Sequence, residues 1–268
     1  MTRRLTLTLA LLTVALLAPP ALGAGGPVAG TDAGPEGVTA PGDPSRYATF
    51  RTGGGTLVEQ IQRDGGQITG WRFLRRALTL PVVAFDGSAT GLSADGRTLV
   101  LASPRSGRPR RHSGFAVLDA QRLRPRFETT LRGDFTLDAI SPDGNRLFLI
   151  QYTSRRDFSR YTVRAYDVGA RRLLARPIVD PAEADEPMRG NPLARAMSAD
   201  GRWAYTLYDG NGEHPFIHAL DTVAARAKCV DLDQLAGRQD LFGLGLGIDR
   251  SGALVVREPE HHAALLVV

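Results

Sequence analysis

The chain has 268 residues, 43% of them hydrophobic, which is enough to bury the core of one sizeable domain. Its formal charge is +5, and Lys228 is the only lysine among 33 basic residues, a bias more typical of a GC-rich genome than of a polyanion-binding protein. Its single cysteine, Cys229, excludes an intrachain disulfide, so the hydrophobic core must stabilise the fold. We interpret Cys229 as a buried strand residue.

The first 23 residues have the pattern of an export signal. Arg3 and Arg4 precede an apolar run over 5–17, two prolines end that run, and small residues at 21–23 provide a cleavage position. The run has 13 residues, whereas a membrane span needs about 20, so we expect cleavage, with an uncleaved anchor helix as the alternative. The predicted location is secreted or associated with the cell envelope, with no transmembrane span after signal removal.

Residues 24–46 are rich in Gly, Ala and Pro and offer little to bury, so we predict a disordered leader there. Strand-like runs follow at 47–50, 57–62 and 68–73.

A phrase with the pattern apolar-Ser-x-Asp-Gly then recurs along the chain. Three copies and a degraded fourth lie at 92–96, 140–144, 197–201 and 248–252, and their glycines are 48, 57 and 51 residues apart. Asp-Gly between apolar runs predicts a hairpin turn, because glycine accepts a positive φ without steric cost. A second turn marker, an apolar residue followed by Asp, comes 24, 24 and 21 residues after the first, at Asp119, Asp167 and Asp221.

Two hairpins in each repeat make four strands, which is one blade of a β-propeller. Three strands of a last unit are predicted at 244–249, 253–256 and 263–268. Three full repeats with an incomplete unit at each end favour five blades. The alternative is a four-bladed ring in which the two ends share one blade. The predicted fold class is therefore all-β, a small propeller of four-stranded blades over residues 47–268.

The repeats resemble those of the YVTN-type bacterial propellers and, more loosely, WD repeats and the lactonase-type propellers. The motifs that carry the resemblance are Ser-Pro-Asp-Gly at 141–144 and Leu-Asp-Thr at 220–222, over roughly residues 47–268. Seven blades are usual in the YVTN family, and this chain is too short for seven. Such propellers host many unrelated functions, so the resemblance implies a fold and no particular activity.

The best candidate site follows from the architecture. The first strand of each blade lines the central channel, and the loops that enter these strands form one mouth of it. These loops carry Asp86, Asp134, Asp138 and Arg189, which we therefore predict to converge on a ligand site. The competing interpretation is that these groups satisfy backbone amides and one another around the pore.

The chain shows no catalytic motif, so we assign no catalytic residue and expect no cofactor and no bound metal. The five histidines are not spaced as metal ligands, the loop at 209–214 lacks the glycine of a calcium loop, and the acidic stretch 180–186 is interpreted as a solvated connector.

Three functions compete. The first is an exported, non-catalytic, monomeric propeller that presents a binding face to a protein or cell-envelope ligand. The second is a lactonase-like or sugar-acid hydrolase at the channel mouth. The third is adhesion to anionic surfaces through arginine-rich loops at 105–112 and 155–160. The chain has no pattern of aromatic residues for base stacking, which argues against a nucleic-acid partner. An enzyme needs carboxylates or histidines within hydrogen-bond reach of each other in the mouth, whereas a binding module needs an exposed apolar patch.

Overall fold

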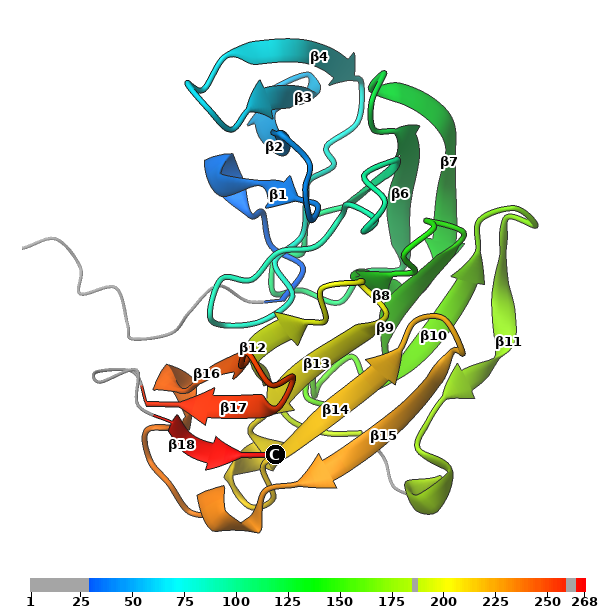
Figure 1. The fold of residues 1–268 in the computed structure, drawn as a ribbon. Helices are drawn as coiled ribbons and strands as arrows, with labels where there is room; N and C mark the ends of the chain where they lie inside the picture. The colour runs from blue at the N-terminus through cyan, green and yellow to red at the C-terminus, as the bar shows by residue number, and fades with distance from the viewer. Residues whose placement is uncertain (1–28, 185–187, 259–263) are drawn as a thin grey trace, which may run out of the picture.

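Five antiparallel sheets surround a central channel in the computed structural model, which describes residues 29–184, 188–258 and 264–268 (Figure 1). Three of the sheets have four strands and two have three. The chain is a β-propeller, and the predicted count of five blades is confirmed. No helix in the described ranges has the length and apolar character needed to cross a bilayer.

The blades follow one another in chain order. Blade 1 consists of β1 (Val38–Thr39), β2 (Ser45–Thr52), β3 (Gly55–Gln62) and β4 (Ile68–Leu74). Blade 2 consists of β5 (Thr98–Ala102), β6 (His112–Asp119) and β7 (Arg124–Arg132). Blade 3 consists of β8 (Asp134–Ile140), β9 (Arg146–Tyr152), β10 (Tyr161–Asp167) and β11 (Arg172–Ile178). Blade 4 consists of β12 (Pro192–Met197), β13 (Trp203–Tyr208), β14 (Phe216–Asp221) and β15 (Arg226–Asp231). Blade 5 consists of β16 (Gly245–Ile248), β17 (Leu254–Arg257) and β18 (Ala264–Val267).

The Ser-x-Asp-Gly phrases form the turns between the first and second positions of their blades. In the 141–144 copy, Ser141 Oγ donates to Asp143 Oδ1 at 2.6 Å and accepts from the Arg146 amide at 2.9 Å. Gly144 has φ +71°, a conformation that a side chain makes costly. Ser93 and Ser198 make the same pairs of bonds, so the phrase is a local turn device.

The second turn marker also repeats in three dimensions. Asp119, Asp167 and Asp221 each accept a hydrogen bond at Oδ1 from the amide three residues later. The residue after that amide adopts positive φ without being glycine, at Leu123, Arg171 and Ala225. These turns join the third strand to the outer strand, as the spacing predicts.

The inner strand of blade 2 is interrupted. Its two pieces bridge β5 at Leu92–Leu99 and Thr79–Ala102, and the residues between them leave the blade. The amides of Phe85 and Asp86 donate to the carbonyls of Pro192 and Leu193, both at 2.9 Å. This loop therefore links blade 2 directly to β12 of blade 4.

Residues 29–46 lie against the propeller, which differs from the predicted disordered leader. β1 pairs with β2 at Val38–Tyr47, and the Gly30 amide donates to the Val82 carbonyl at 2.7 Å. Gly-rich composition did not prevent packing here, because backbone hydrogen bonds hold the segment and Val38 and Ala40 are buried. The predicted signal at 1–23 lies outside the described residues, and the domain boundaries stay a prediction.

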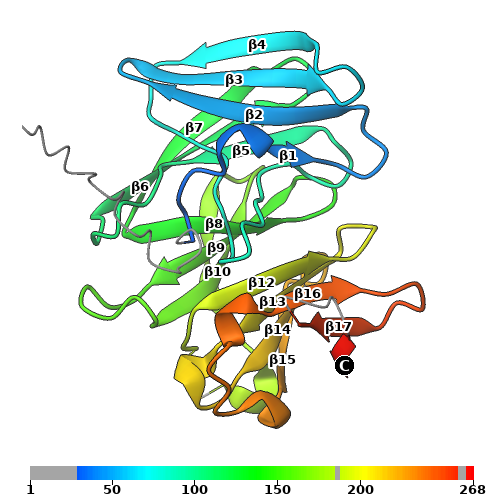
Figure 2. The same ribbon diagram turned by 90° about the vertical axis from the view of Figure 1, so that its left-hand side faces the viewer.

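Most of the core lies between neighbouring blades. One cluster joins blades 1 and 2 through Tyr47, Val58, Leu74 and Leu118. Further clusters join blades 2 and 3, blades 3 and 4, and blades 4 and 5. Neither view shows a described strand between blade 1 and blade 5, so one face of blade 1 has no neighbouring blade (Figures 1 and 2).

Candidate functional site

Two predicted site residues, Asp86 and Asp138, meet in the channel around an arginine that the sequence did not single out. Asp138 of β8 and Arg195 of β12 form an ion pair in which each side chain is only 5% exposed. Asp86 Oδ2 accepts from the Arg195 amide at 3.0 Å. The negative charge of Asp138 is therefore already neutralised within the fold. A charged residue at an inward position of an apolar inner strand was the available signal for Arg195.

Asp134 is enclosed by two arginines from the loop before β6. Its carboxylate pairs with Arg105 at 3.4 Å and with Arg110 Nε at 2.9 Å, and it is 6% exposed. Arg105 is itself buried, with its guanidinium 3.6 Å from the centre of the Tyr152 ring. Burial lowers the pKa of Arg110, and the hydrogen bond that Arg110 donates to Asp134 opposes that shift. These two cations of the predicted adhesive loop are internal, whereas Arg108 and Arg111 are exposed.

Arg189 does not join the three aspartates in the channel. It is exposed and lines a separate cavity of about 210 Å³ near the outer end of blade 4, together with Asp180, Glu183 and Cys229. Burial, followed by the effect of Glu183, raises the pKa of the Cys229 thiol well above its usual range. The four residues predicted to form one site therefore lie in three places. Asp86 and Asp138 both contact Arg195, Asp134 contacts Arg105 and Arg110, and Arg189 lines a different cavity.

The channel leaves little room for a ligand. A cavity of about 60 Å³ lies toward the starts of the inner strands and contacts Tyr152 and Asn191. A second, of about 130 Å³, lies among the Asp-Gly turns and contacts Ala94 and Gly201. Asp138 contacts both cavities, so its ion pair separates them. Both volumes are below the roughly 300–1,000 Å³ of a typical small-ligand pocket.

No nucleophile–base pair lies in the described part of the channel. Burial raises the pKa of Tyr208 and Tyr161, so both phenols stay protonated at neutral pH. Burial lowers the pKa of His218 to about 4, with Asp138 and Asp180 acting in the opposite direction, so its ring is neutral at pH 7. The Asp134 and Asp138 carboxylates in the channel accept hydrogen bonds from arginines and are therefore not free to act as general bases.

An exposed apolar surface lies instead on blade 1. Phe50, Leu57 and Phe73 are consecutive cross-strand partners in β2, β3 and β4, and Trp71 lies two residues from Phe73 on the same face. We call these four side chains the aromatic face. Trp71 is 67% exposed, Phe73 42% and Phe50 36%.

The opposite face of blade 1 packs on blade 2, where Arg72 Nε donates to the Leu123 carbonyl at 3.1 Å. The aromatic face is therefore directed away from blade 2. The short helix η1 (Gly34–Glu36) packs on β2 beside it, where Arg46 donates to the Pro35 carbonyl. The sequence signal for this face was the alternation of Trp71 and Phe73 with Arg72, which places the two rings together on one side of a strand.

No family model matches the chain, and no curated protein matches it in sequence. Among solved structures, the chain is similar to hydrazine synthase from Kuenenia stuttgartiensis, with 15% identity and a TM-score of 0.49 over 85% of this chain and 56% of that one. It is also similar to TolB from Acinetobacter baumannii, with 11% identity and a TM-score of 0.44 over 83% and 51%. The β-propeller domain of Cps50 (Swd1) from Myceliophteria thermophila has 12% identity and a TM-score of 0.48 over 90% and 69%.

The chain spans about half of the length of the first two of these proteins. Such identities concern the fold alone, so function is argued below from the residues.

Proposed function

We propose that the protein is an exported, non-catalytic β-propeller that binds a protein partner at the cell envelope through the aromatic face of blade 1. The observation that carries the proposal is the exposure of three aromatic rings on one sheet face. Large exposed apolar patches are uncommon on monomeric proteins and mark interaction sites.

The shape and composition of this surface favour a protein over a small molecule. Small ligands bind in concave cavities that enclose most of their surface, whereas β2, β3 and β4 present an extended sheet face. Aromatic side chains are also the residues most enriched at the centres of protein interfaces, where they contribute much of the affinity. Export and membership of the YVTN-type propellers belong to the same proposal and rest on the sequence patterns.

The hydrogen bonds that the channel carboxylates accept support the proposal that the protein is not an enzyme. A general base must be able to take a proton, and Asp134 and Asp138 each accept hydrogen bonds from a buried arginine. Asp86 is exposed, but one of its oxygens accepts the Ser88 amide and the other the Arg195 amide. No observation in the described channel favours the lactonase-like alternative.

The test is site-specific photo-crosslinking in the producing cell. A benzophenone amino acid at position 71 is compared with the same group at Val223, which is 56% exposed in the β14–β15 turn of blade 4. We expect one discrete protein adduct from position 71 and none from position 223. With that protein purified, Trp71→Ala combined with Phe73→Ala should weaken binding by about 30-fold or more, the effect of losing an interface hot spot.

Equal crosslinking at both positions, or unchanged affinity in the double variant, would reject the aromatic face as the binding surface. Metal-dependent lactone hydrolysis that disappears in Asp138→Asn would establish the enzyme alternative in its place.

A further inference from the structure

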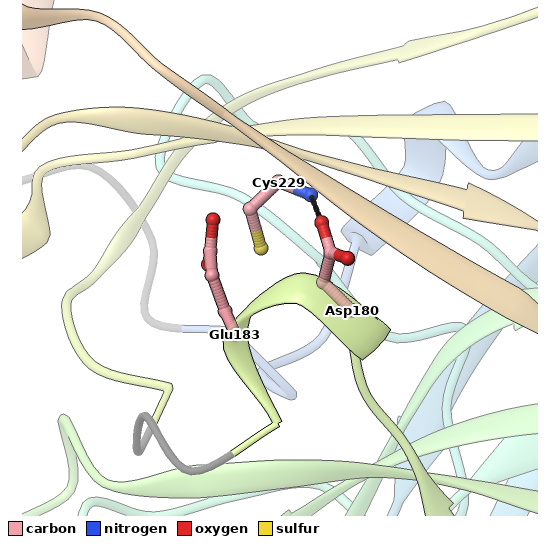
Figure 3. Close-up of side chains that lie close together, drawn as sticks. All are labelled: Asp180, Glu183 and Cys229. Atoms are coloured by element: carbon pink, nitrogen blue, oxygen red, sulfur yellow. Dashed lines mark hydrogen bonds between the residues drawn. The ribbon is translucent and has the colours of Figure 1, made fainter.

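A cluster of metal-ligating side chains lies at the outer end of blade 4, far along the sheet from the channel strand β12. The connector after β11 forms the short helix η2 (Pro181–Glu183), which lies against β15. Asp180 fastens this contact: one of its carboxylate oxygens accepts the Ala182 amide at 2.9 Å and the other accepts the Cys229 amide at 2.8 Å. Figure 3 shows Glu183 and Cys229 side by side next to Asp180.

The donor atoms of these three residues are close enough for one ion. One carboxylate oxygen each from Asp180 and Glu183 and the Sγ of Cys229 all lie within 4.8 Å of one another. Ligand atoms around a tetrahedral zinc are roughly 3.5 Å apart, given metal–oxygen and metal–sulfur distances of about 2.1 and 2.3 Å. Small side-chain rotations would therefore bring the three atoms to bonding distance, and two of the three residues are only half-buried.

A fourth donor stands beside the cluster. His218 of β14 is directly opposite Cys229 of β15 in the strand register, so the two side chains project from the same face of blade 4. His218 is 2% exposed, and its Nε2 has no hydrogen-bond partner among the described residues. Burial lowers the pKa of its imidazole, and both Asp138 of the channel and Asp180 of the cluster oppose that shift. Buried polar atoms normally have partners, so this unpartnered ring nitrogen is open to a ligand. It lies outside the group of donor atoms within 4.8 Å of one another, so the imidazole must rotate toward Cys229 to share an ion with them.

The surroundings suit a cation that arrives from solvent. The cavity of about 210 Å³ in front of the cluster gives an ion access and leaves room for water ligands. Besides Asp180 and Glu183, its lining includes the carboxylates of Glu213 and Asp231, against the one guanidinium of Arg189 and the imidazole of His214. The balance of charge in the cavity is therefore negative.

We propose that Asp180, Glu183 and Cys229, with His218 as the fourth ligand, bind a thiophilic divalent cation of the zinc type. Burial and the neighbouring Glu183 carboxylate raise the pKa of the Cys229 thiol, so it is protonated before an ion binds. On binding, the Cys229 sulfur forms a bond to the cation and its proton is released to solvent, so no oxidant or reductant is needed. The ion would tie the β11–β12 connector to the outer strand of blade 4, in a chain whose single cysteine allows no intrachain disulfide. This departs from the expectation that the chain binds no metal.

The test uses Co²⁺ as a spectroscopic probe on the purified full-length chain. We expect one Co²⁺ per chain, a near-ultraviolet thiolate-to-cobalt charge-transfer band, and displacement of the band by Zn²⁺. Cys229→Ser should abolish the band, and Glu183→Gln, which keeps the shape of the side chain, should weaken Zn²⁺ binding by about tenfold or more. The matched control is His214→Ala, since His214 is exposed on the same cavity and should leave binding unchanged.

A second measurement separates ligand loss from misfolding. Zn²⁺ should raise the melting temperature of the wild-type chain and of His214→Ala but not that of Cys229→Ser. His218→Gln should bind Co²⁺ more weakly while its circular dichroism stays that of the wild type. Absence of the band in the wild-type chain, or a band that persists in Cys229→Ser, would overturn the proposal.

Discussion

The central channel and the aromatic face of blade 1 contrast in both charge and exposure. The channel brings together carboxylates and arginines from three blades, but they are almost fully buried and already paired, Asp138 with Arg195 and Asp134 with Arg105. The aromatic face carries no ion pair among its four side chains and leaves Trp71 two-thirds exposed. Convergent charge in this propeller therefore marks where the blades are joined, whereas the apolar side chains of blade 1 are left uncovered and form the proposed binding surface.

The largest effect on stability is expected when one charge of the channel is removed, which tests whether the buried ion pair joins the blades. Asp138→Ala should destabilise the fold by about 3–5 kcal/mol, because it leaves the buried Arg195 guanidinium without its carboxylate. Urea unfolding followed by circular dichroism measures the loss. Asp138→Leu combined with Arg195→Met should recover most of it, since no buried charge is then left unpaired. A loss below about 1 kcal/mol in the single variant would show that the pair is not a structural joint.

A backbone test compares a glycine turn that packs against a neighbouring blade with an open glycine turn of blade 1. Gly144→Val should cost about 1–3 kcal/mol, because Gly144 has φ +71° and an added Cβ would overlap the Thr98 side chain of blade 2. Gly65, in the β3–β4 turn, has φ +85° but open space around it. Gly65→Val therefore reports the backbone strain alone. Equal shifts in melting temperature for both variants would rule out an inter-blade contribution at Gly144.

A smaller effect is expected at the turn serine. Ser141→Ala should cost about 1 kcal/mol, because Ser141 bonds both the Asp143 carboxylate and the Arg146 amide. The hydrogen bond from Ser141 lowers the pKa of Asp143 in the folded chain, so as the pH falls the unfolded chain takes up the proton first. The stabilisation is thus present above the ordinary aspartate pKa and is lost as the pH falls through the lowered one. Thermal melts between pH 7 and pH 2 should show a shallower acid loss in Ser141→Ala; an identical loss would contradict the assignment.

The smallest effect on stability is expected at the aromatic face. Trp71→Ala and Phe73→Ala should each change the free energy of unfolding by about 0.5 kcal/mol or less, because both rings are exposed in the free protein. Urea unfolding of the two variants against Phe135→Ala, a fully buried ring in blade 3, gives the contrast. Phe135→Ala should cost about 3–5 kcal/mol. A comparable loss at Trp71 would mean that the face is covered in the isolated chain and is not available to a partner.

The repeat phrases show which features sequence alone determines. Ser141, Asp143 and Gly144 interact within a few residues, so the hydrogen bonds that form the turn are implied by the local pattern. Because the spacing of these turns sets the number and length of the strands, the five blades, β2 to β4 of blade 1 and the three strands of blade 5 were predicted correctly. β1 instead lies in the segment predicted to be disordered, and blade 2 has three strands where four were predicted. The packing of residues 29–46 was not predicted, since it depends on backbone hydrogen bonds to residues far along the chain, such as that from the Gly30 amide to the Val82 carbonyl, 52 positions away.

The sites were decided by tertiary structure, because their members are far apart in the chain. Asp138 and Arg195 are 57 residues apart, and Asp180 and Cys229 are 49 residues apart. The position of the aspartates near the inner strands predicted that they lie in the channel. Only the tertiary structure showed that arginines neutralise two of them and that Arg189 faces a different cavity. The exposure of Trp71 and Phe73 depends likewise on which blade faces meet. The hydrogen bonds of a turn join neighbouring residues and can be predicted from the sequence. Ion pairs and surface exposure depend on which blades pack together, so only the tertiary structure decides them.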